Sequence, residues 1–91
     1  MNQEENSYAQ GAATIKRYLH DMSNGAGVYR MIGADGATLY IGKAKNLKAR
    51  VSSYAQAAAL NTRLQRMVSQ VAAMDIVTTR SEAEAFLLEA N

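Results

Sequence analysis

The chain has 91 residues, of which 48% are hydrophobic and 20% are charged, as in an ordinary small globular domain. It contains no cysteine and a single histidine, which excludes disulfides, thiolate metal sites and a histidine metal cage. No apolar run approaches the roughly 18 residues of a membrane span, and the first ten residues lack the features of a signal peptide. We therefore expect one cytoplasmic domain without membrane contact.

The net charge is only +2, but the positive charges are concentrated in the middle of the chain. No Asp or Glu occurs between Gly36 and Met74. The cations of that segment are Lys43, Lys45, Lys48, Arg50, Arg63 and Arg66. A basic segment of this kind favours a polyanionic partner such as nucleic acid. On charge alone, a solvated helix face is an equally good interpretation.

The first half of the chain predicts a helix followed by a β-hairpin. Residues 1–10 are polar and aperiodic, which predicts a flexible tail ahead of a folded domain at residues 11–91. Apolar side chains at helical spacing predict a helix from Gly11 until the SNGAG segment. Residues 28–32 and 38–41 alternate as strands around the turn GADG, and we expect Gly42 to allow a sharp turn after them.

The second half predicts two helices, a strand and a last helix. Asn46 is the predicted N-cap of a helix with the apolar stripe Leu47, Val51 and Tyr54. A further helix is expected at 60–71 and a third strand at 74–78, and an S-x-x-E capping box at Ser81 starts the last helix. The fold class is therefore α+β, in the order α-β-β-α-α-β-α. Because that helix ends apolar and uncapped at Asn91, we expect a longer natural protein.

The length of the hairpin loop decides how Tyr29 and Tyr40 are arranged. A four-residue loop at 33–36 places them directly opposite each other, and a two-residue loop at 35–36 places them on a diagonal. Both loops put the two phenols on one face. We expect the other face to be the core face, formed by Val28, Ile32, Leu39 and Ile41, with Arg30 unexplained among them. An aromatic pair that only packs is the alternative to a functional pair.

Cationic side chains follow the second tyrosine. Lys43 comes three residues after Tyr40, and Arg50 and Tyr54 are i, i+4 neighbours on the next predicted helix. A guanidinium binds phosphate oxygens in a bidentate manner, and a nearby cation lowers a phenol's pKa from its usual value near 10. The set favours an anionic substrate and phosphate transfer. Glu89 is the best-placed candidate for a single carboxylate ligand of Mg²⁺, with a solvated carboxylate as the alternative.

These residues also spell a known pattern. GVY at 27–29 and YIG at 40–42 resemble the two halves of the GIY-YIG nuclease signature. The strings YIGKAKNLKARVSSY and VTTRSEAEAFLLEAN resemble the N-terminal domains of the UvrC family, which belongs to the bacterial excinuclease ABC. The resemblance covers residues 25–91. Two departures are that Ala26 stands where the family usually has proline, and that the family segment following LEAN is missing.

The resemblance implies a small three-stranded antiparallel sheet flanked by helices and a metal-dependent DNA endonuclease. Tyr40 would be the general base that activates water, aided by the charge of Lys43. Tyr29 would orient the water or the phosphate, while Arg50 would stabilise charge on the phosphate with support from Tyr54. The remaining implied role is that of Glu89, the single ligand of Mg²⁺ or Mn²⁺.

The resemblance further implies incision on the 3′ side of a lesion in nucleotide-excision repair, leaving a 5′-phosphate and a 3′-hydroxyl. The implied partners are double-stranded DNA carrying a lesion, UvrB, which would bind through regions outside this chain, and UvrA upstream. The remaining basic residues, predicted to contact DNA, are Lys45, Lys48, Arg63 and Arg66. A stand-alone GIY-YIG nuclease and a non-catalytic nucleic-acid-binding module are the alternatives, and these 91 residues alone are expected to be weakly active.

Overall fold

The computed structural model of the chain describes residues 3–56, 58 and 60–79. The elements in chain order are α1 (Gln3–Leu19), β1 (Gly27–Ile32), β2 (Thr38–Ala44), α2 (Leu47–Ser53), α3 (Thr62–Ser69) and β3 (Ala73–Thr78). The α+β class and the predicted order are confirmed as far as the third strand. The predicted last helix, which starts at Ser81, lies outside the described residues.

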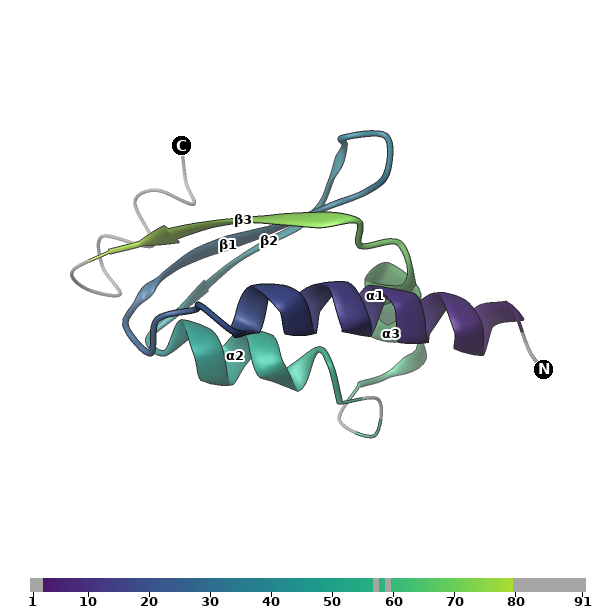
Figure 1. Cartoon of the computed structure of the whole chain (residues 1–91), viewed down its shortest axis with the longest axis horizontal. Helices are drawn as coiled ribbons and strands as arrows, with labels where there is room; N and C mark the ends of the chain where they lie inside the picture. The colour runs from purple at the N-terminus through teal and green to yellow at the C-terminus, as the bar shows by residue number, and fades with distance from the viewer. Residues whose placement is uncertain (1–2, 57, 59, 80–91) are drawn as a thin grey trace.

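The three strands form one antiparallel sheet in the order β2-β1-β3. Strand β1 is therefore central, and β2, which carries Tyr40, is an edge strand. Figure 1 shows α1 and α2 on the same side of the sheet, running beneath the strands. This arrangement leaves one sheet face against helices.

The helix-covered face is the one that carries the tyrosines. Tyr29 is 2% exposed and Met31 is fully buried, whereas Ile41 and Val77 on the other face are 41% and 51% exposed. The predicted core face was therefore wrong, although Leu39, beside the bulge, packs against the core. The buried apolar residues are Ala12, Ile15, Met22, Tyr29, Met31, Ala44, Leu47, Val51, Tyr54, Val68, Val71 and Met74.

The outward direction of Arg30 explains its presence in a central strand. It lies on the face opposite to Tyr29, directly across from Asp75 of β3, and the two side chains form an ion pair. A cross-strand pair of opposite charges at an exposed position stabilises a sheet modestly.

The register of the hairpin follows the diagonal arrangement. Tyr29 lies opposite Gly42 and Met31 lies opposite Tyr40, which is the register expected for a two-residue loop. The turn itself is longer, because the Gly33 N–H donates to the carbonyl of Ala37 at 2.9 Å. A β-bulge between Met31 and Ile32 absorbs the difference.

Helix α1 begins well before the predicted boundary. Residues 3–10, predicted to be a flexible tail, are part of the helix. The half-buried Tyr8 donates its hydroxyl to the carbonyl of Tyr54 at 2.9 Å, and Gly11 lies so close to α3 that a Cβ there would sit 1.8 Å from the Val68 oxygen. The polar residues of this segment lack an apolar period, but these contacts hold it against α2 and α3.

Asparagine side chains cap the two shorter helices. The Asn46 side chain accepts from the Ala49 N–H at 3.0 Å, and Asn61 accepts from the Leu64 N–H at 2.9 Å. The first cap was predicted, and the second moves the start of α3 to Thr62. Within the described part of the chain, no helix is both long and apolar enough to span a bilayer.

Candidate active site

Three tyrosines from three elements form a cluster beneath the sheet. Tyr29 of β1 and Tyr40 of β2 have ring centroids 6.1 Å apart, and Tyr54, the C-cap of α2, lies 5.9 Å from Tyr29 and 6.1 Å from Tyr40. The hydroxyls of Tyr29 and Tyr54 share a hydrogen bond of 2.9 Å. We call these three residues the tyrosine cluster.

Gly42 makes room for this cluster. It stays within β2, so the predicted sharp turn does not occur, and the only positive φ among the described residues belongs to Gly36. A Cβ at position 42 would lie 2.3 Å from both Cζ and the hydroxyl oxygen of Tyr29. Glycine is needed here because the ring of Tyr29 lies across the backbone of its cross-strand neighbour.

Burial keeps two of the three phenols in their protonated form. Burial raises the pKa of Tyr29 far above its ordinary value, and the hydrogen bond to Tyr54 and the neighbouring phenols act in the same direction. Burial also raises the pKa of Tyr54. The Arg50 guanidinium favours the charged forms of both groups but does not overcome burial. Tyr29 and Tyr54 therefore stay protonated at neutral pH, and Tyr40, 39% exposed, is the member of the cluster that solvent reaches.

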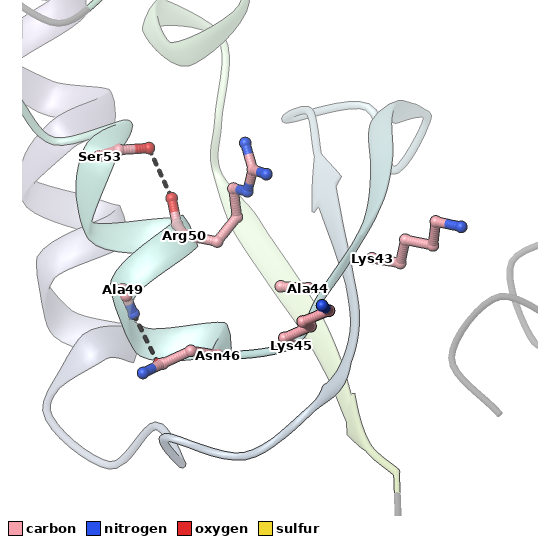
Figure 2. Close-up of a pocket in the computed structure, with 7 residues that line it drawn as sticks. All are labelled: Lys43, Ala44, Lys45, Asn46, Ala49, Arg50 and Ser53. Carbon is pink, nitrogen blue, oxygen red and sulfur yellow. Dashed lines mark hydrogen bonds between the residues drawn. The ribbon is translucent and has the colours of Figure 1, made fainter. Parts of the chain in front are cut away.

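A cationic cleft lies beside the cluster, between the end of β2 and the exposed side of α2. This first cleft has a volume of ≈ 590 Å³. Its lining residues are Lys43, Ala44, Lys45, Asn46, Ala49, Arg50 and Ser53. Figure 2 shows Arg50 extending from α2 toward the strands, and Lys43 projecting from β2. No carboxylate is among the lining residues, so the described walls of the cleft suit an anion.

The local fold of α2 places Arg50 in this cleft. The cap at Asn46 starts the helix immediately after β2, and the Arg50 N–H donates to the Asn46 carbonyl at 3.1 Å. Arg50 thus sits one turn into the helix. Ser53 lies one further turn along and donates its hydroxyl to the Arg50 carbonyl at 2.6 Å, as the dashed line in Figure 2 marks.

The predicted site residues that the structure describes lie in four places. Tyr29, Tyr40 and Tyr54 form the cluster, while Lys43, Lys45 and Arg50 line the first cleft. Lys48 is exposed on α2 outside the lining of that cleft. Arg63 and Arg66 lie on α3 and line a separate cleft.

The predicted metal ligand, Glu89, lies outside the described residues. Among residues 3–56, 58 and 60–79, no group of three or more His, Asp or Glu side chains could hold a metal ion. The first cleft, lined by ammonium, guanidinium, amide and hydroxyl groups, fits a phosphate better than it fits a bare cation. A divalent cation would need a carboxylate from elsewhere in the chain together with substrate oxygens.

Sequence reasoning missed two contributors. Ser53 lines the first cleft, and its signal was its position three residues after Arg50 on one helix face. Tyr8 supports the cluster by donating to the Tyr54 carbonyl, and no local signal pointed to it because the surrounding residues are polar and aperiodic.

Known proteins share both the sequence and the architecture. Residues 25–91 match the model of the UvrC-like GIY-YIG domain. UvrABC system protein C of Rhizobium meliloti is 51% identical over 82 residues, which make up 90% of this chain and 12% of that protein. The same protein of Sphingopyxis alaskensis is 56% identical over 81 residues, 89% of this chain and 13% of its own length.

A solved structure agrees with these matches. The GIY-YIG N-terminal endonuclease domain of UvrC from Thermotoga maritima, bound to its catalytic divalent cation, magnesium, superposes with a TM-score of 0.75 at 31% identity. The match covers 85% of this chain and 83% of that domain. The chain itself spans only 12–13% of the length of the two curated relatives. With the family model, the relatives and the sheet topology in agreement, the chain belongs to the UvrC-like GIY-YIG domain family.

Proposed function

We propose that this domain is a metal-dependent endonuclease module that hydrolyses a phosphodiester bond of DNA. The observation that carries the proposal is the junction of the tyrosine cluster with the first cleft. Tyr40 and Lys43 share strand β2, and the charge of Arg50 acts on the two buried phenols. This junction supports a site in which a base, protonated hydroxyls and phosphate-binding cations act on one phosphate.

Each residue has a distinct role in the proposed reaction. Lys43 and Arg50 bind the scissile phosphate, and Arg50 stabilises the negative charge that grows on it. The water oxygen attacks phosphorus while its proton passes to the side-chain oxygen of Tyr40, which acts as the base and exchanges the proton with solvent. The bond from phosphorus to the 3′-oxygen breaks, and that oxygen takes up a proton from solvent. The products are a 5′-phosphate and a 3′-hydroxyl.

The buried phenols position the reacting groups. Because Tyr29 and Tyr54 remain protonated, they can donate hydrogen bonds to the water or to the phosphate but cannot act as bases. Glu89 would hold one divalent cation, Mg²⁺ or Mn²⁺, which supplies charge stabilisation for the leaving 3′-oxygen. The involvement of a divalent cation accords with the magnesium bound to the related domain of Thermotoga maritima UvrC.

The proposal extends to the longer protein of which such a domain is a part. Incision on the 3′ side of a lesion in double-stranded DNA, with UvrA and UvrB as partners in the cytoplasm, is supported by the similarity to UvrABC system protein C. The exposed basic residues Lys45, Lys48, Arg63 and Arg66 are proposed to contact DNA phosphates. A binding module that does not cut is the competing function.

Two substitutions test the catalytic interpretation. Arg50→Ala should lower the rate of cleavage of a bubble or lesion-bearing duplex in Mg²⁺ by about 10²–10³, since one transition-state donor is lost. Glu89→Gln should abolish cleavage and leave DNA affinity within a few-fold. Both rates are measured under single-turnover conditions, in this chain and in the longer protein with its partners.

Lys16→Ala on the exposed side of α1 is the matched control, because it removes a positive charge away from the cleft. Its rate should stay within about twofold of the parent rate. If Glu89→Gln cleaves at the parent rate, Glu89 has no catalytic role. If neither parent protein cleaves while both bind DNA, the domain is a binding module.

A further inference from the structure

A second cleft lies at the other end of β2. It has a volume of ≈ 530 Å³ and is formed where α3 approaches the edge strand. Its lining residues are Leu39, Thr62, Arg63, Arg66, Met67 and Gln70. It shares no residue with the first cleft.

The second cleft is also positively charged. Arg63 and Arg66 are three residues apart on α3, so they share one side of the helix, and both are exposed. No acidic side chain lines the cleft. Among the described residues, no carboxylate forms an ion pair with either of these arginines.

Strand β2 contributes a lining residue to each of the two clefts. Leu39 lines the second cleft, Lys43 lines the first, and Tyr40 lies between them on the same strand. Four residues of strand extend by about 13 Å. The phosphates of one DNA strand wind around the helix axis while they advance about 3.4 Å each along it, so a separation of this size spans at least two nucleotides. One DNA backbone lying along the β2 edge can therefore reach both clefts.

We propose that the second cleft binds backbone phosphates of the same DNA, two to four nucleotides to one side of the bond cleaved at the first cleft. The proposal rests on the proposed nuclease function, because the cleaved bond defines the register. Arg63 and Arg66 hold phosphates, and the apolar Leu39 and Met67, which also line the cleft, contact the sugar-phosphate chain. The second cleft thereby sets the direction in which DNA crosses Tyr40.

The experiment pairs protein and DNA changes. Single phosphates on either side of the incised bond are replaced, one at a time, by neutral methylphosphonates in a duplex with one defined lesion. Incision by the full-length protein with its partners is measured at sub-saturating DNA, for the parent and for Arg63→Gln/Arg66→Gln. Lys16→Gln/Arg17→Gln on α1 removes the same charge and serves as the control.

In the parent protein, neutralising phosphates two to four nucleotides from the incised bond, on one side only, should lower incision about tenfold. In Arg63→Gln/Arg66→Gln the same DNA changes should have no further effect, since the contact is already lost. The control pair should keep the parent's sensitivity. A variant that keeps the full sensitivity in this window, or loses it only within one nucleotide of the incised bond, overturns the proposal.

A binding measurement separates this proposal from the nuclease function. Affinity of the 91-residue chain for a 20-base-pair duplex is measured without divalent metal across a range of salt concentrations. Loss of the two arginine contacts should reduce the slope of log affinity against log salt by about one to two. An unchanged slope rejects the proposed binding of DNA phosphates by the second cleft, even if Arg50→Ala abolishes cleavage. A reduced slope supports it even if the chain proves not to cut.

Discussion

Tyr29 shows how one side chain can belong to both the core and the site. Its ring is among the largest fully buried side chains, yet its hydroxyl ends at a hydrogen bond with Tyr54 beside the first cleft. Two influences on its ionisation oppose each other, the guanidinium of Arg50 and the loss of water. Loss of water dominates, so the pKa of Tyr29 is raised, whereas Tyr40 is the more exposed phenol of the cluster.

Gly42 offers a test at this scale. Gly42→Ala would place a methyl group within 2.3 Å of the Tyr29 ring, so the ring or the edge strand must move. We expect a loss of about 1–3 kcal/mol in the free energy of unfolding and a large loss of incision, because the cluster and β2 shift together. Denaturant unfolding and single-turnover incision provide the two measurements.

Gly25→Ala is the matched control, because its new Cβ would meet only Ser23 Oγ at 3.1 Å and a Thr78 methyl at 3.9 Å. It should cost less stability and leave incision close to the parent rate. Equal effects at the two positions would show that the close approach of Tyr29 to Gly42 is unimportant.

The identity of the core face could not be predicted from the hairpin alone. Both faces carry apolar side chains, since Val28 and Ile41 alternate with Tyr29 and Tyr40 along the two strands. The choice depends on which face the helices cover, and that is a tertiary property. The sequence did predict that the two tyrosines share a face, because side chains alternate between the two faces along each strand and this alternation depends only on neighbouring residues.

At the scale of elements, the two asparagine caps can be compared directly. Asn46→Ala and Asn61→Ala each remove one side-chain hydrogen bond to a helix N-terminus, and each should cost about 1 kcal/mol of unfolding free energy. Asn46→Ala should lower incision more, because Arg50 sits one turn into the helix that this cap begins. Unfolding curves and single-turnover rates at a temperature where both variants are folded make the comparison. Equal incision rates would show that the start of α2 does not position Arg50.

Patterns of neighbouring residues predicted most of the helices and strands. They failed where an element is stabilised by contacts with residues far away in the sequence. The turn at GADG, the cap at Asn46 and the apolar stripe of α2 lie within a few residues of the structure they specify. The first turns of α1 have no such stripe, and they are stabilised by contacts such as that of Tyr8 with Tyr54, 46 residues away. The first cleft was predicted only in part. Ser53 was missed, although it lines the cleft one helical turn after Arg50.

For the whole molecule, ionisation of the buried phenols predicts an alkaline limit to stability. The pKa of Tyr29 is raised in the folded state, so the folded chain keeps a proton that the unfolded chain releases above about pH 10. The contribution of this protonated phenol to the free energy of unfolding is therefore fully present below about pH 10. Above that pH it should fall by about 1.4 kcal/mol per pH unit. Tyr54, whose pKa is also raised, adds to the slope.

Urea unfolding between pH 8 and pH 11.5 measures this dependence. Tyr29→Phe lacks the group, so its unfolding free energy should decline less steeply than that of the parent above pH 10. Parallel curves for the two proteins would mean that the Tyr29 phenol ionises alike in both states. The difference between the curves isolates this group from the lysines, which titrate in a similar range.

Helix α1 has a practical consequence for anyone trimming this domain. The family model begins at residue 25, beyond the end of α1 at Leu19, yet Ile15 is fully buried and Tyr8 holds the backbone of Tyr54. A fragment cut at that boundary would strip one wall from the hydrophobic interior and expose the inner side of α3 at Val68 to water. The start of the family-model match and the start of α1 are, in this protein, about twenty residues apart.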